Sequence, residues 1–467
     1  TNVPFNTQTI IQGLDSLQKK IYLLNIVEQK ELRFYEKMFA KSTFISDTLN
    51  PFIYNIYPII IGKYFTNNRQ SFYQTGAGIN IFGSFSKNWS YQLSFQDVNV
   101  KADNLQNALE TITNQGQTGI NSLPNPQSQN INFSELRTHL IYSFKNGYID
   151  FGQDYQNWGE GVDGKIVLSS KAPTYPYLKV AYKPVKWLKF SFMLAWLHSK
   201  VLDSGNFYNL PQPNIGAFRE SYVDKYLSTH SIDFQIKKGL TLSLGESVIF
   251  SDKFQFNYIM PFNFFKAAET NLNLGNNNAS SNGQFFAQIN SRNQIKNTQI
   301  YATLFIDEIR IATIFDSKKN RNQLAYTIGV NNTDLILSNL TVGIEYTKIR
   351  PFVYSNFIPA QTYQHYNYSL GYWLPNNSDR VLMFINYTPV DKLYLQLRYS
   401  KISIGNTFNI LQQYTIVEEP QFLEGGYKTT TEWYFKINYQ VVKRGNIFVE
   451  YSTYNNYTLS VGLNYGL

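Results

Sequence analysis

The chain has 467 residues, and 41 Lys and Arg against 32 Asp and Glu give it a formal charge of +9. Charged residues make up only 16% and aromatic residues another 16%, which excludes a disordered chain, since disorder goes with few aromatics and high charge. The absence of cysteine excludes disulfide frameworks, Cys-based zinc sites and thiol nucleophiles. Lys and Arg are scattered along the chain, which argues against nucleic-acid binding.

The first 50 residues differ from the rest. Residues 1–5 show no basic region followed by an apolar one, so either the protein is cytosolic or a signal peptide has been removed. The missing cysteines and the low charge favour export, and we expect an exported protein whose signal peptide has been removed. Apolar residues then recur at helical spacing, at Ile10, Leu14, Leu17, Ile21, Leu24 and Val27. We therefore expect residues 1–50 to form a periplasmic amphipathic helical segment, which either packs on its own barrel or docks a partner, and residues 51–467 to form a barrel.

From about residue 75 onward, the sequence alternates with a period of two, which indicates strands with two different faces. One such segment alternates Leu188, Phe190, Phe192, Leu194 and Trp196 with other residues. The last segment alternates apolar or aromatic residues from Tyr457 to Leu467 with small polar ones. Alternation alone does not tell lipid from water on the apolar face.

The connections between these segments point to a membrane. Tight turns are expected at 86–89, 145–147, 183–186, 237–239, 389–392, 443–445 and 455–456, and most of them are flanked by aromatic residues. Long polar loops are expected at 97–134, 154–177, 200–228, 252–284, 351–379 and 404–430. Short periplasmic turns, long outer loops and an aromatic girdle are typical of an outer-membrane β-barrel.

An open sheet edge in hydrocarbon would leave backbone groups unpaired, so the sheet must close into a barrel. About 16 to 18 strands of the usual length fit into residues 75–467, and residues 325–345 admit one strand or two. The predicted fold is therefore an all-β transmembrane antiparallel barrel of about 18 strands, preceded by the helical segment. The final Gly462-Leu-Asn-Tyr-Gly-Leu467 is similar to the terminal signal of outer-membrane proteins, with Leu in place of Phe; an ordinary edge strand is the alternative.

Motifs for catalysis are weak. Gly159-Glu-Gly-Val-Asp-Gly164 matches a dinucleotide fingerprint, but no helix is expected after it, and we interpret the match as chance. The four histidines stand singly, without metal-ligand spacing. We expect no enzyme activity and no cofactor or metal, although a His, Ser and Asp from distant strands could still meet in space.

Four ordered blocks of sequence resemble the Wzi-like capsule-assembly family of outer-membrane barrels. The first runs from Phe151-Gly-Gln-Asp-Tyr-Gln-Asn-Trp158 to Lys179, the second from Lys225 through His230 to Ser247, the third from Tyr258 to Phe262 and the fourth from Glu345 to Tyr354. The resemblance weakens after Tyr366, where Ser369-Leu-Gly-Tyr-Trp-Leu374 departs from the family pattern.

This resemblance implies a barrel of about 18 strands in the cell outer membrane that binds or anchors capsular polysaccharide without enzyme activity. Its implied partners are outer-membrane lipid and lipopolysaccharide, surface polysaccharide and possible envelope proteins. Two alternatives stay open: an accessory subunit of a gliding, secretion or adhesion complex, and a diffusion pore.

Two groups of residues are candidates for a site. Aromatic residues of one outer loop could stack on sugars or serve as packing and girdle residues: Tyr354, Tyr363, Tyr366, Tyr368, Tyr372 and Trp373. Polar residues in or beside strands are expected to face the lumen, because a charge facing lipid is costly. They are Asp154, Trp158, Glu160, His230, Glu246, Glu345 and Arg350, and they would brace the barrel or contact a ligand.

Overall fold

The structure is a computed structural model that describes residues 45–49, 52–114, 128–163, 165–209, 218–266, 268, 281–308, 322–408, 421–454 and 457–466. The helical segment expected between residues 7 and 40 lies outside the described residues. No helix among the described residues is long and apolar enough to cross a membrane.

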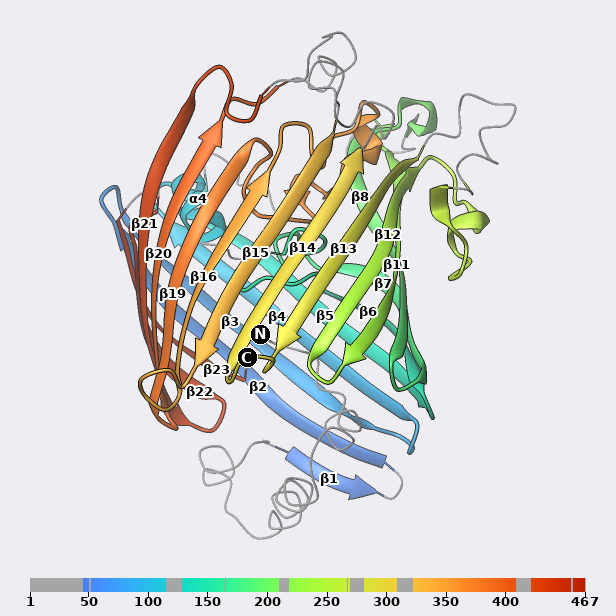
Figure 1. The fold of residues 1–467 in the computed structure, drawn as a ribbon. Coiled ribbons are helices and arrows are strands. Elements are labelled where there is room, and N and C mark those ends of the chain that lie inside the picture. The colour runs from blue at the N-terminus through green and yellow to red at the C-terminus, as the bar shows by residue number, and fades with distance from the viewer. Residues whose placement is uncertain are drawn as a thin grey trace.

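Eighteen antiparallel strands close into one barrel, which confirms the predicted fold (Figure 1). The strands are β2 (Phe52–Asn67), β3 (Ser71–Ser84), β4 (Trp89–Ala102), β5 (Asn130–Phe144), β6 (Gly147–Asp154), β7 (Tyr175–Val185), β8 (Leu188–Leu202), β11 (Tyr222–Lys237), β12 (Leu240–Ser251), β13 (Asn282–Arg292), β14 (Thr298–Glu308), β15 (Gln323–Thr333), β16 (Leu340–Ile349), β19 (Ser378–Val390), β20 (Leu393–Gly405), β21 (Tyr427–Val442), β22 (Gly445–Ser452) and β23 (Thr458–Tyr465). Residues 325–345 thus belong to two strands.

The closing seam joins the first and last barrel strands. Residues 60–67 of β2 pair with β23, while residues 52–56 of β2 pair with a short outer strand, β1 (Ile45–Leu49). Pro58, which has no backbone N–H to donate, falls in the interval between the two pairings.

The apolar face of the strands points outward. In β23, Leu459, Val461 and Leu463 are exposed, whereas Thr458 and Ser460 are buried toward the lumen. Exposed apolar side chains in this alternation run all round the wall, where lipid tails would solvate them. The period of two in the sequence therefore reflects the alternation of side chains between the lipid face and the lumen face of the barrel wall.

The two ends of the barrel differ. Eight short turns, from β3–β4 to β21–β22, lie at the end where the chain enters β2 and leaves β23, which we call the turn end. The long connections lie at the opposite loop end. The connections from β2 to β3 and from β22 to β23, at the loop end, are also short. The tight turn expected at 455–456 lies outside the described residues.

Several loop-end connections fold into the lumen of the barrel. The helix α4 (Leu105–Asn114), in the β4–β5 connection, packs into an inner cluster with lumen-facing Phe65, Phe72 and Val100. The β6–β7 connection (155–174) and the β16–β19 connection (350–377) also fold into the lumen. Short elements in these and other connections are η2 (Ser204–Asn206), β9 (Tyr208–Asn209), β10 (Phe218–Arg219), η4 (Phe256–Tyr258), η6 (Pro359–Gln361), β17 (Gln364–His365) and β18 (Tyr368–Ser369).

The start of the β12–β13 connection takes the opposite course. Residues 252–266 and 268, which we call the outer flap, lie against the outside of β8, β11 and β12 (Figure 1). There Tyr258 and Phe265 bury the outward-facing Phe192, Leu194 and Phe250. The flap in turn exposes its own Phe256, Met260, Phe262 and Phe264.

Candidate functional site in the barrel lumen

The two inward connections meet in a hydrophobic core inside the lumen. Ser169 N–H donates to Leu370 O at 2.7 Å, and Tyr363 Oη donates to Val167 O at 3.0 Å. Ile166, Val167 and Leu168 are fully buried there against inward side chains of the strands. We call this pair of connections the plug.

Three of the expected sugar-stacking residues belong to this core. Tyr354, Tyr363 and Tyr372 are 7%, 0% and 1% exposed, and Tyr354 stacks on Tyr363 with ring centroids 5.5 Å apart. Burial raises the pKa of all three phenols above the usual range. Their faces are covered by protein, so they pack the plug and do not present a stacking surface.

The tip of the β6–β7 connection is clamped to the far wall. Asp163 pairs with Arg380 of β19 and with Arg398 Nη1 of β20, the latter at 3.0 Å. Burial alone would raise the pKa of Asp163, but the two guanidinium groups hold it well below its usual range. Beside it, Glu345 of β16 accepts a hydrogen bond from Val162 N at 2.6 Å.

The glycine-rich tip is what allows this crossing. Gly159 and Gly161 adopt φ of +111° and +153°, a region that side chains disfavour. Residues 159–163 of the motif therefore serve as the turn of a lumen-crossing loop, which is consistent with a chance match to the dinucleotide fingerprint.

A polar pocket lies in the lumen beside this tip, on the side of the turn end. Its volume is about 530 Å³, and Trp158, Glu160 and Tyr148 lie along it. The remaining lining is made of amides, hydroxyls and charged groups: Asn157, Gly159, Lys179, Lys189, Ser191, Ser231, Asp233, Gln235, Gly239, Thr241, Ser243, Gln288, Asn290 and Arg292. Lys179 Nζ lies 5.5 Å from the Trp158 ring centroid. Such a lining offers many donors and acceptors around one aromatic face.

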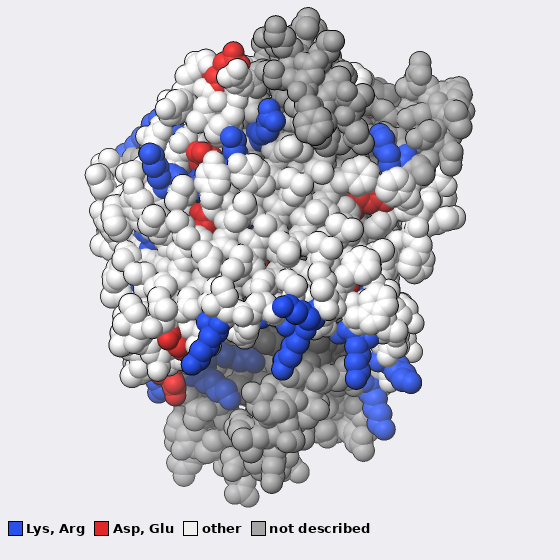
Figure 2. All heavy atoms as spheres, in the orientation of Figure 1, with Lys and Arg blue, Asp and Glu red and all other residues white. Residues whose placement is uncertain are grey.

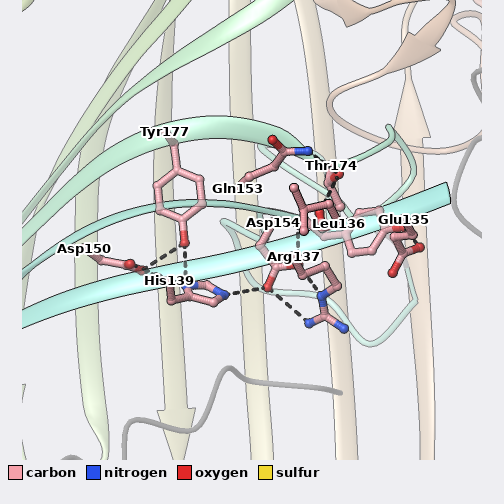
Figure 3. A network of polar contacts seen from close by, with 10 residues as sticks. Glu135, Leu136, Arg137, His139, Asp150, Gln153, Asp154, Thr174 and Tyr177 are labelled. Carbon is pink, nitrogen blue, oxygen red and sulfur yellow. Dashed lines mark hydrogen bonds and ion pairs between the residues drawn. The ribbon is translucent and has the colours of Figure 1, made fainter. Parts of the chain in front are cut away.

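A buried polar network braces the wall next to the pocket (Figure 3). Asp154 accepts from Arg137 Nε at 2.7 Å and lies 3.0 Å from His139 Nε2. The other ring nitrogen of His139 lies 3.2 Å from Asp150, to which Tyr177 Oη donates at 2.9 Å. Sequence reasoning found Asp154 but missed its neighbours. The available signal was their even spacing on one face of a strand, two residues apart for Arg137 and His139 on β5 and four apart for Asp150 and Asp154 on β6.

A second cluster lies at the loop end, where the β17–β18 hairpin adjoins β8. Tyr366 stacks on His198 with centroids 4.4 Å apart, and Lys200 Nζ lies 5.7 Å from the Tyr366 ring. Lys171 Nζ lies 5.9 Å from the ring of Tyr368. Burial lowers the pKa of Lys171 to about 8. We call these five side chains the rim cluster.

His365 contacts the rim cluster through a hydrogen bond with His198. Burial, together with nearby Lys225 and His198, lowers the pKa of His365 to about 3. The neutral ring can therefore accept a hydrogen bond from His198 N at 2.9 Å through Nδ1. Trp373, the last of the expected loop aromatics, is half-buried between Arg380 and Tyr454.

Of the seven expected lumen residues, four face the lumen or line its polar pocket, one follows a strand and two lie on the outward face. Asp154 and Glu345 face the lumen, and Trp158 and Glu160 line the polar pocket from the plug. Arg350 follows β16 and is half-buried at the start of the β16–β19 connection.

His230 and Glu246 do not face the lumen. They lie on the outward face of β11 and β12, beneath the outer flap, with His230 Nε2 3.1 Å from Glu246 Oε1. Glu246 also accepts from Phe265 N of the flap at 2.7 Å. A cover of protein on the lipid side is the alternative to lumen exposure that reasoning from the cost of a charge in lipid left out.

Comparisons with solved structures support the barrel. Wzi of Escherichia coli, an outer-membrane protein involved in group 1 capsule assembly and described as a carbohydrate-binding β-barrel, superposes with a TM-score of 0.54 at 11% identity. The match covers 97% of this chain and 89% of Wzi. OpdK of Pseudomonas aeruginosa, solved with vanillate, gives a TM-score of 0.50 at 9% identity, over 88% of this chain and 98% of OpdK.

No family model and no curated protein matches the chain. At these identities the solved structures establish the fold, which is that of outer-membrane β-barrels, and give no support to a role in gliding motility.

Proposed function

We propose that this protein is a closed outer-membrane barrel that binds and anchors surface polysaccharide, in a lectin-like manner and without enzyme activity. The observation that carries the proposal is the plug, because a packed hydrophobic core crosses the lumen where a channel would run. The clamp of Asp163 to Arg380 and Arg398 holds that core against the opposite wall.

The chemistry of the polar pocket favours a carbohydrate ligand. Hydroxyl groups of a sugar need several donors and acceptors in a small volume, which the pocket's amides and hydroxyls provide. The face of Trp158 offers the apolar surface on which sugar C–H groups pack. The carbohydrate-binding neighbour Wzi, matched over most of both chains, agrees with this proposal.

The rim cluster adds a preference for acidic polysaccharide. Lys171 and Lys200 lie over the rings of Tyr368 and Tyr366, so a cation and an aromatic face stand together twice at the loop end. A uronic acid or phosphate-bearing sugar would place its charge on the lysines.

A diffusion pore is the alternative, and conductance separates it from our proposal. Purified protein in planar bilayers is expected to show no steady single-channel current. Asp163→Asn removes the shared counter-charge of two arginines, loosens the plug and is expected to produce flickering current. Asp391→Asn, in an exposed turn, is the matched control and should stay silent. Steady current through the unmodified protein would contradict a closed barrel.

Glycan binding is tested separately. Protein pulled down from native membranes in mild detergent is expected to retain polysaccharide, and Trp158→Ala is expected to reduce the retained amount about fivefold or more, as loss of a stacking residue does. A protein that is silent in bilayers but elutes with envelope proteins and no glycan would instead be an accessory subunit of a larger complex.

A further inference from the structure

The turn-end rim of the barrel is strongly basic. Seven of its eight turns carry Lys or Arg, the β15–β16 turn being the exception, and the acidic residues within them are Asp334 and Asp391. Figure 2 shows Lys and Arg side chains gathered along this lower edge. The turn-end cations are Lys87, Lys145, Lys186, Lys238, Lys296, Lys392, Lys443 and Arg444.

Within this rim, a cleft opens between the β5–β6 and β7–β8 turns. It has a volume of about 490 Å³, and its lining contains four lysines and no Asp or Glu. Lys189 is paired with Asp233 at 3.2 Å. Lys145, Lys183 and Lys186 are exposed and form no ion pair with the described part of the chain.

The cleft is also bordered by apolar surface on its lipid side. Phe144 and Tyr182 line it, with ring centroids 6.1 Å apart, and Tyr182 is 39% exposed on the outward face. Val185, which lines the cleft, and Trp187, which follows Lys186, are also exposed. Cations at the rim, next to aromatic and aliphatic side chains on the wall, match the two parts of a phospholipid: its charged phosphate at the membrane surface and its apolar acyl chains in the membrane.

We propose that this cleft binds the phosphate headgroup of an anionic phospholipid from the membrane leaflet at the turn end. The phosphate is held by Lys145, Lys183 and Lys186. The acyl chains lie along the outer wall and contact Tyr182, Val185 and Trp187. The cleft adjoins the polar pocket, with which it shares Tyr148 and Lys189, but Lys145, Lys183 and Lys186 do not line that pocket. The proposal therefore does not rest on the polysaccharide function proposed above.

Native mass spectrometry of the full protein in a nonionic detergent tests this. The probe is dihexanoyl phosphatidylglycerol, with dihexanoyl phosphatidylcholine and glycerol phosphate as comparison ligands. We expect phosphatidylglycerol to bind preferentially, and K145Q/K183Q/K186Q to weaken its binding more than tenfold, since each lysine near an anionic headgroup contributes measurably. K237Q/K238Q/K296Q removes as many charges from the same rim outside the cleft and should weaken binding less than twofold.

Three outcomes would overturn the proposal. Equal weakening by both triple variants would mean general attraction to a basic rim. Equal competition by glycerol phosphate would identify free phosphate as the ligand and remove the lipid from the site. Equal binding of phosphatidylcholine would remove the role of net charge. Migration on unboiled SDS gels shows that each variant is folded before it is compared.

Discussion

At the scale of single residues, Lys171 connects burial to the proposed binding of acidic glycans. Its amine sits half-buried over Tyr368, and burial lowers its pKa to about 8. A lysine with an unshifted pKa near 10.4 would stay charged throughout the physiological range, whereas Lys171 loses its charge within reach of ordinary buffers. Its attraction for an anion is therefore present below pH 8 and absent above it.

Retention of acidic polysaccharide is accordingly expected to fall about fivefold between pH 7 and pH 9, the loss of roughly 1 kcal/mol expected for one exposed charge pair. Lys171→Arg is the control, because a guanidinium stays protonated at pH 9 and should flatten the profile. Glycan pull-down across that pH range measures both proteins. Identical profiles for the two would show that Lys171 does not contact the ligand.

At the scale of elements, the outer flap explains how a histidine and a glutamate can occupy the outward face of the wall. His230 and Glu246 lie between the strands and the flap, and Phe265 N–H donates to the same carboxylate that contacts His230. A carboxylate on the membrane face without such a cover would meet hydrocarbon, at a cost of several kcal/mol. The flap thus makes the outward position of the pair tolerable.

Glu246→Ala is expected to release the flap, because Phe265 N–H and His230 then lose their acceptor, at a cost of about 1–3 kcal/mol. Trypsin should then cut the folded protein after Lys253 and Lys266 about tenfold faster. Glu246→Gln keeps an acceptor for Phe265 N–H and should show a smaller effect. Leu244→Ala is the control, because Leu244 lies on the same face of β12 but nearer the turn end and outside the cover of the flap. It should not change the cleavage rate.

The same elements show what the sequence could predict. Alternation along β8 or β23 predicts the strands and their outward face, because the period is local to each strand. The course of a long loop is not local: Tyr354 and Phe262 are both loop aromatics, yet one is 7% exposed inside the barrel and the other 81% exposed outside it. The polar character of His230 predicted a lumen position only under the assumption that lipid covers every outward residue.

At the scale of the whole molecule, the barrel is closed by a seam of unequal strands. β2 has 16 residues and β23 has 8, so the last strand covers only the loop-end part of the first. Gly462, in the middle of β23, lies under the ring of Phe448 and pairs with Lys63 of β2, next to Gly62. A Cβ there would come within 2.5 Å of the ring and 2.8 Å of the backbone oxygen of Gly62.

Gly462→Ala is therefore expected to strain the seam, with the 1–3 kcal/mol that overpacking usually costs. The temperature at which the compact form converts to the unfolded band on SDS gels should fall by roughly 5 °C. Gly283→Ala is the matched control, because the nearest atom to its added Cβ is 4.0 Å away. Equal conversion temperatures for the two variants would show that closure tolerates a side chain at Gly462.

The distance along the chain between the two halves of the plug has a consequence for assembly. Ser169 Oγ donates to Gly371 O across 202 residues, and Tyr354 Oη to Ile166 O across 188. Contacts of such separation carry a large loop-closure entropy until the intervening strands have already brought their ends together. We therefore expect the wall to form first and the plug to pack later, so that a newly inserted molecule passes through a stage in which the lumen is not yet filled.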